Sequence, residues 1–263
     1  MTSNSDKNNR RIFPTKTYLL QVCNYTILVD KMSDFSKYSR CIAKTDKFFY
    51  VASLFTMICV RANTLKKVLP IFTTCEDWDS ASVYSLSRIL VENCLFFLWF
   101  CEGEDEGDLV DLKINLINYH DCMERLKLFK LIGDEENILF FSSELIKLKN
   151  SIMNNTIFNE LPQDENHFSK NDLLKGRSAS FEKYSYIAMR YGYEKKEYIL
   201  SYKYKSQFIH SFPISFHRME QDYRGCGVYS KFEEDSIKSS LNELSKILRK
   251  AFSMFKKAKK RNS

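Results

Sequence analysis

The chain has 263 residues, enough for one large domain, or two small ones, with a sizeable hydrophobic core. Only 7 glycines and 4 prolines occur, which argues against β-sandwiches and α/β folds, because their many tight turns use both residues. The net charge is +7, but residues 246–263 carry eight Lys or Arg and no Asp or Glu, which leaves −1 for residues 1–245. The charge therefore does not imply a nucleic-acid-binding surface over the whole body, and it marks 246–263 as a basic tail.

Eight cysteines occur, none in a CxxC pair. We expect reduced, mostly buried thiols, among them Cys59, Cys94 and Cys101, in a cytoplasmic protein, because a disulfide framework or a zinc site would need paired ligands. The polar start, MTSNSDKNNRR, lacks the apolar segment of a secretory signal. The longest apolar runs fall short of the roughly 18 residues that span a membrane, so no transmembrane segment is predicted.

Most of the chain shows the apolar periodicity of amphipathic helices. The first predicted helix contains enough β-branched residues to leave a strand open as an alternative. The polar stretch 155–175 predicts a surface loop with a short helical turn, and Ser178 or Ser180 is the expected cap of the helix after it. The predicted helices are 15–31, 33–42, 47–69, 79–101, 108–131, 137–154, 178–190, 195–210 and one that begins at 233.

The segment 79–101 is apolar on every side over 95–100, which is typical of a central helix covered on all faces. Its first half carries Arg88 and Glu92, one helical turn apart, and a charged pair in such a helix is costly unless it is partnered. We therefore predict an all-α fold, a single irregular bundle of roughly eight helices around 79–101. Residues 1–13 are expected to be disordered, and 14–263 to form one domain.

Five acids fall within the seven residues 102–108, which superficially suggests a calcium loop. Counting from Glu102, however, puts Lys113 where the bidentate glutamate of an EF-hand belongs, so no metal site is predicted. His120 lies on or near the apolar stripe of the next helix and is expected to be a boundary histidine. The sequence has no glycine-rich phosphate loop and no GxSxG elbow, and no cofactor is predicted.

A polar stripe with steps of four residues is predicted on the helix 195–210. Its members are Tyr198, Tyr202, Ser206 and His210. One interpretation is a tyrosine-rich amphipathic helix whose polar tips hydrogen-bond at the core boundary. The other joins His210 to Arg88 and Glu92, so that the imidazole moves protons, the carboxylate orients it and the guanidinium holds phosphate.

The segments SLSRILVEN (85–93) and GRSASFEKYSYIAMRYGYEKKEYILSYKYKSQFIHSFPISF (176–216) resemble a bacterial domain-of-unknown-function family, numbered 5677, over roughly 45–220. That family has an Arg-x-x-x-Glu helix and a Tyr-rich helix that ends in Ser-x-x-x-His. The matching positions here are Arg88, Glu92, Tyr202, Ser206, His210 and Ser211. The resemblance implies an all-α fold similar to the HEPN group, which includes RNA-cleaving toxins and phage-defence effectors. Unlike that nuclease pattern, this chain has no Arg followed by a His four to six residues later on one helix.

Two functions follow as hypotheses. The resemblance implies an RNA-directed toxin or phage-defence effector that acts as a metal-independent ribonuclease. Its catalytic residues would be Arg88, Glu92, Ser206 and His210, and its substrate-binding residues Tyr202, His217 and Arg218. The alternative is a non-catalytic helical interaction or regulatory module whose polar residues are structural.

The basic tail suggests a further contact. It suits RNA, acidic lipid or a protein partner, although solvated lysines are the simpler interpretation. The residues concerned are Lys256, Lys257, Lys259, Lys260 and Arg261. The partners considered are RNA, a protein partner and a second copy of the chain.

Overall fold

The computed structural model describes residues 14–73, 78–103, 107–210, 213 and 225–262, and it confirms the predicted all-α fold. Within these ranges no strand forms, and the β-type pairing is confined to the isolated bridges Trp78–Gly227 and His167–Glu182. The helices are α1 (Lys16–Ser36), the 3₁₀ turn η1 (Arg40–Ile42), α2 (Asp46–Lys67), α3 (Ser80–Cys101), α4 (Asp108–Ile132), α5 (Glu135–Met153), α6 (Thr156–Glu160), α7 (Lys170–Leu174), α8 (Tyr184–Arg190), α9 (Lys195–Ile209) and α10 (Lys231–Asn262).

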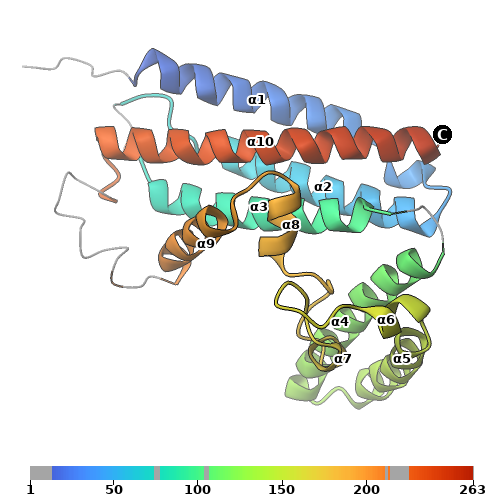
Figure 1. Ribbon diagram of the computed structural model, residues 1–263. Coiled ribbons are helices and arrows are strands. Elements are labelled where there is room, and N and C mark those ends of the chain that lie inside the picture. Colours follow the sequence, from blue (N-terminus) through green and yellow to red (C-terminus); the bar gives the residue numbers. More distant parts are fainter. Residues whose placement is uncertain (1–13, 74–77, 104–106, 211–212, 214–224, 263) are drawn as a thin grey trace, which may run out of the picture.

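Four long helices, α1, α2, α3 and α10, run side by side and form the main bundle (Figure 1). The helix α3 packs against α2 and α10 in this bundle and against α8 and α9 outside it, so it is central, as predicted. The helices α4 and α5 form a hairpin that extends away from the bundle, with α6 and α7 beside it (Figure 1). The site described below lies where α9 crosses α3 and meets α10.

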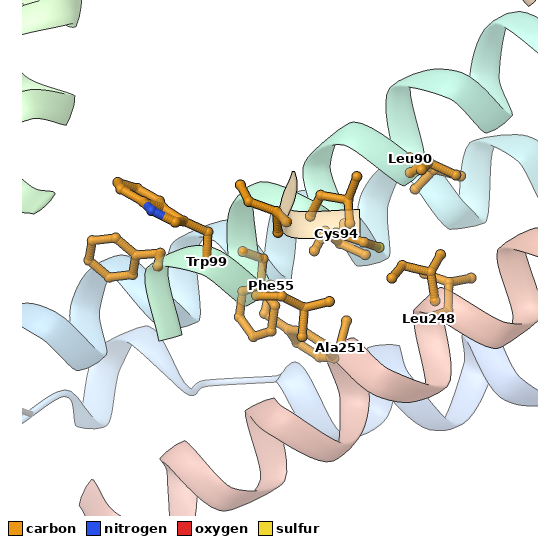
Figure 2. Packing of buried hydrophobic residues seen from close by; sticks show 14 of the residues in the cluster. Phe55, Leu90, Cys94, Trp99, Leu248 and Ala251 are labelled. Atoms are coloured by element: carbon orange, nitrogen blue, oxygen red, sulfur yellow. The ribbon is translucent and has the colours of Figure 1, made fainter. Parts of the chain in front are cut away.

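The core of the bundle is aromatic. Phe55 of α2 stacks on Phe255 of α10 with ring centroids 4.0 Å apart, and Phe97 of α3 lies 5.5 Å from Phe55. Figure 2 shows how Phe55, Cys94 and Ala251 converge in this layer. Cys59, Cys94 and Cys101 are buried and form no disulfide with another described residue, as predicted. Close packing of such large rings joins the consecutive helices α2 and α3 to α10, which is distant from them in sequence.

Cap residues set the starts of the long helices. The Thr45 hydroxyl accepts a hydrogen bond from the Phe48 N–H (3.2 Å) and starts α2. The Asp79 carboxylate accepts from the Ala81 and Ser82 N–H groups (3.0 and 3.2 Å) and starts α3. Because a cap satisfies amide donors that have no helical partner, these two starts are readable from sequence.

Two local predictions are wrong. The separate helix expected over 33–42 does not form: α1 continues to Ser36, Tyr38 takes the left-handed conformation (φ 61°) and only the turn η1 follows. Neither Ser178 nor Ser180 caps a helix, since α8 begins at Tyr184. The two serine hydroxyls instead donate to the Ser180 and Glu182 carbonyls (both 2.8 Å), because short hydroxyl side chains readily satisfy local turns.

Two described helices, α2 and α3, are long and apolar enough to cross a membrane by length and composition alone. In their most apolar windows, 44% of the α2 residues and 61% of the α3 residues are buried inside the fold. Core helices of bundles meet the same criterion, so this is weak evidence for a membrane span.

Candidate functional site

A buried carboxylate of α10 binds the N-terminus of α3. Glu233 is fully buried, and its carboxylate accepts from the Ser80 N–H (2.7 Å) and from the Gly225 N–H (2.9 Å). A carboxylate at the N-terminus of α3 satisfies the orphan amides and complements the helix dipole. This contact holds α3 in register, so that Arg88 and Glu92, two to three turns further on, face α9.

Arg88 is held by two partners. Its Nε lies 3.2 Å from Oε1 of Glu92, and its Nη2 donates to the hydroxyl of Tyr202 on α9 (2.5 Å). The guanidinium carbon also lies 4.1 Å from the centroid of the Tyr202 ring. The Arg88 and Glu92 side chains are only 15% and 25% exposed, so water screens the pair weakly. The structure thus brings together three predicted site residues from two helices.

A second ion pair joins α9 to α10 beside this arginine. The Lys205 ammonium donates to the Glu243 carboxylate, and the Lys205 side chain is only 7% exposed. Both residues line the same narrow pocket as Arg88 and Glu92. The sequence reasoning missed this pair, because 38 residues separate its members and no spacing rule connects them.

Tyrosine hydroxyls surround the ion pairs. The hydroxyls of Tyr193 and Tyr198 are buried without a hydrogen-bond partner among the described residues. Burial, followed by the Glu92 carboxylate, raises the pKa of Tyr184 to about 12. The same two causes raise the pKa of Tyr198 well above its ordinary value. These phenols therefore stay protonated at neutral pH.

Two neighbouring cavities lie along α9. The pocket at Arg88 has a volume of about 10 Å³, close to the minimum that one water molecule needs. A larger cavity of about 410 Å³ lies next to it, between α9, α10 and the turn 191–193. Tyr198, Ser201 and Glu243 line both, so these residues form the wall between the two spaces.

The model of a family of unknown function, DUF5677, matches residues 54–227, about two thirds of the chain. The chain belongs to this family. No curated protein and no solved structure matches it. The region that matches DUF5677 contains Arg88, Glu92, Tyr202 and Lys205, whereas Glu243 lies on α10, beyond it.

The remaining predicted catalytic residues of this DUF5677 member lie further along α9. Ser206 is half-buried, and His210 is exposed at the end of the helix. The backbone N–H of His210 donates to the backbone carbonyl of Ser206 (3.2 Å). Neither residue lines either cavity. Eight residues separate Tyr202 from His210, which corresponds to about 12 Å along a helix. His217 and Arg218 lie outside the described residues.

The basic residues 246–262 are part of α10 and pack on the bundle through their apolar side. The Lys259 ammonium donates to the Phe35 carbonyl (3.0 Å), and Lys256 lies over the Phe252 ring (4.7 Å to the centroid). Asn262 ends the helix with a hydrogen bond to the Ile42 carbonyl (3.0 Å). The exposed residues of the basic set are Lys256, Lys257, Lys260 and Arg261.

Another polar cluster, which the sequence reasoning missed, joins α8 to the end of α3. Arg190 bridges the carboxylates of Glu102 and Glu182 (2.6 Å to each from Nη2), and the Tyr191 hydroxyl donates to Glu102 (2.7 Å). Every charge in this cluster is paired, which is typical of a structural clamp. The described part of the chain contains no group of three or more potential metal ligands.

Proposed function

We propose that this DUF5677 protein is an RNA-directed toxin or phage-defence effector of HEPN-like type. The observation that carries the proposal is Arg88, a half-buried guanidinium that lies against an aromatic ring in a narrow pocket between α3 and α9. A guanidinium offers a planar fork that matches phosphate oxygens, and an aromatic ring stacks unpaired bases. The free thiols among the described cysteines are consistent with a cytoplasmic location.

The proposed chemistry needs no metal ion. Arg88 holds a backbone phosphate, Glu92 orients the guanidinium, and Tyr202 stacks a base. His210 accepts the proton of the 2′-hydroxyl as its oxygen attacks the adjacent phosphorus, the P–O5′ bond breaks, and the same imidazolium returns the proton to the leaving 5′-oxygen. Because His210 lies about 12 Å beyond Tyr202 along α9, the RNA strand must follow this helix and present neighbouring nucleotides to the two residues. Ser206 lies between them, where its hydroxyl can contact the ribose.

Binding of a fluorescent single-stranded RNA, followed by anisotropy, tests the role of Arg88. Arg88→Lys keeps the charge but removes the planar fork, so we expect RNA affinity to fall about tenfold or more. Arg125→Lys is the matched control, because Arg125 also pairs with an acid four residues away, Asp121, but on the exposed face of α4. Equal affinities for the two variants would remove Arg88 from the binding site.

A second candidate, a non-catalytic interaction module that dimerises, is favoured by the α4–α5 hairpin. Large apolar side chains near its turn are 56–83% exposed, namely Leu128, Leu131, Ile132, Leu139 and Phe140. Three of them, at steps of three and four, share one face of α4. Lys130 lies in the last turn of α4, and Glu135 and Glu136 lie in the first turn of α5, so the hairpin tip carries charges of both signs that two copies could pair. A second copy on a two-fold axis would cover the apolar patch and pair these charges.

The solution mass of the full chain, measured by light scattering, tests this candidate. Leu131→Glu places a charge in the centre of the patch and should shift a dimer to a monomer. Val60→Glu on α2 changes another exposed apolar side chain (60% exposed) outside the hairpin, and it should leave the mass unchanged. A monomeric wild type, or a dimer that both substitutions leave intact, would contradict this candidate.

A further inference from the structure

An open groove of about 670 Å³ lies between the end of α8 and the outer side of α9. Both helices lie on the outside of the main bundle (Figure 1). The apolar strip of the groove consists of Met189, Ile199 and Leu200, and the first and last of these side chains are 43% and 58% exposed. The groove shares no lining residue with the pocket at Arg88, so it is separate from the proposed chemistry.

The two sides of α9 have different surroundings. Tyr198 and Lys205 are buried on the side that packs against the bundle. The outer side carries four residues at steps of three and four, which places them on one face of the helix. These residues are Lys196, Ile199, Leu200 and Lys203. An apolar strip that stays exposed on a folded domain is typical of an interaction surface.

The charges around the groove favour an acidic partner. Lys196 and Lys203 are exposed, form no ion pair with another described residue and lie about 10 Å apart along α9, one at each end of the strip. Lys195 also lines the groove and pairs with Glu165 (2.6 Å). Among the described lining residues one is acidic, Glu194. The groove therefore offers an apolar floor between two available ammonium groups.

We propose that this groove binds an acidic amphipathic helix of a protein partner. Such a helix places its apolar side chains, at steps of three and four residues, into a groove between two helices. The flexible Met189 side chain adapts to them, and acids beside the apolar stripe of the partner meet Lys196 and Lys203. RNA fits this surface less well, because the exposed side chains of the strip are aliphatic and provide no ring for base stacking. The docking site does not depend on RNA cleavage.

Fluorescence anisotropy of a labelled synthetic peptide with the full chain tests the groove. The probe is a helical peptide with leucines at steps of three and four residues and glutamates on both sides of the leucine stripe. We expect it to bind, and a peptide of the same composition in scrambled order to bind at least about tenfold more weakly, because it has no apolar stripe. Lysines in place of the glutamates should weaken binding as much. No binding of the acidic probe, or equal binding of the lysine peptide, would overturn the proposal.

A substitution in the strip locates the bound peptide. Leu200→Glu places a negative charge in the apolar floor, so the affinity for the acidic probe should fall about tenfold or more. Leu20→Glu on α1 is the matched control, since Leu20 is 62% exposed, and it should bind the probe like the wild type. Equal affinities of the two variants would place the peptide elsewhere on the molecule and overturn the proposal.

The lysines at the ends of the strip are tested by charge removal. Lys196→Gln combined with Lys203→Gln should lower the affinity for the acidic probe by about threefold or more. Lys16→Gln combined with Lys31→Gln removes two exposed lysines of α1 and should have no such effect. Loss of RNA affinity with unchanged peptide affinity in the first double variant would assign the groove to RNA. A dimeric wild type that Leu200→Glu converts to a monomer would assign it to a second copy, and either result would overturn the proposal.

Discussion

Two ion pairs with the same spacing differ in their surroundings. Arg88–Glu92 and Arg125–Asp121 both join residues four apart, but the first pair is 15% and 25% exposed and the second 54% and 57%. Water solvates both charges of the exposed pair even when they are apart. The charges of the shielded pair have lost most of this solvation, so they are stabilised by each other and by the Tyr202 hydroxyl instead. The loss of one member should therefore be costly only at the shielded site.

Arg88→Met should lower the free energy of unfolding by about 1–3 kcal/mol, because Glu92 then keeps a half-buried charge without its partner. Arg125→Met should lower it by less than about 0.5 kcal/mol. Urea denaturation at neutral pH measures both values. Equal losses for the two variants would mean that burial does not distinguish the pairs.

Lys113 is a buried residue of α4 whose side chain reaches the C-terminal end of α3. Its ammonium donates to the carbonyls of Trp99 (2.6 Å) and Glu102 (2.9 Å). Burial lowers its pKa from the ordinary 10.5 to about 8, and the Glu102 carboxylate offsets part of this effect. Between these two values the unfolded chain binds a proton that the folded chain does not, so the contribution of Lys113 to stability rises with pH in this window.

The stability of the wild type relative to Lys113→Met should consequently increase by about 2 kcal/mol between roughly pH 7.5 and 9.5. The comparison with the variant removes the effect of the tyrosines, which also titrate at alkaline pH. Urea denaturation of both proteins at the two pH values gives the difference. A constant or falling difference would show that the lysine is charged throughout this range in the folded state.

At the scale of the elements, α10 packs against the bundle core with one face and contacts α9 with the other. Its apolar face completes the bundle, where Phe255 stacks on Phe55 and Phe48 (4.0 and 6.2 Å between centroids). Its polar face supplies Glu243 to the ion pair with Lys205, and Lys246 and Lys250 to the larger cavity. The helix thus ties the cavity walls to the core, so damage to the core should also loosen the site.

Phe255→Ala should lower the free energy of unfolding by about 3–5 kcal/mol, because it leaves a cavity in a fully packed aromatic layer. Phe140→Ala on α5 is the control, since that ring is 56% exposed, and it should cost far less. Denaturant unfolding of the two variants provides the test. Similar losses would mean that α10 is not an essential part of the core.

Elements with local signals were predictable from sequence. The apolar periodicity of 47–69 and 79–101 located α2 and α3, and the cap residues Thr45 and Asp79 set their starts, because caps and periodicity act within a few residues. The start of α8 was missed because the Ser178 and Ser180 hydroxyls satisfy a turn, and a hydroxyl serves turns and caps alike. The Arg88–Glu92 pair could be predicted, because its members are four residues apart on one helix. The Lys205–Glu243 pair and the Arg190 clamp could not, because they form between elements that only tertiary packing brings together.

At the scale of the whole molecule, the basic charge is concentrated at one end of α10. Lys256, Lys257 and Lys260 are exposed there, while the bulk of the chain is nearly neutral. If RNA follows α9 and also contacts this end, the three lysines release counterions from its phosphates. Replacing all three with Gln should lower the slope of log affinity against log salt by about 2.

Three exposed lysines of the α4–α5 hairpin, Lys127, Lys147 and Lys149, are the control for this charge effect. Their replacement with Gln changes the net charge equally and should leave the slope unchanged. RNA binding measured over a series of salt concentrations provides both slopes. The same slope for the two triple variants would show that the end of α10 does not contact RNA.

The central claim, that this DUF5677 protein acts on RNA with His210 as acid or base, is tested most directly by RNA cleavage with purified protein. The account predicts that wild-type protein cleaves single-stranded RNA without added metal, and that His210→Ala lowers the rate about 100-fold or more. The melting temperature of His210→Ala shows whether the variant is folded, and His120→Ala on α4 should cleave like the wild type. No cleavage by the wild type, or full cleavage by a folded His210→Ala protein, would contradict the account.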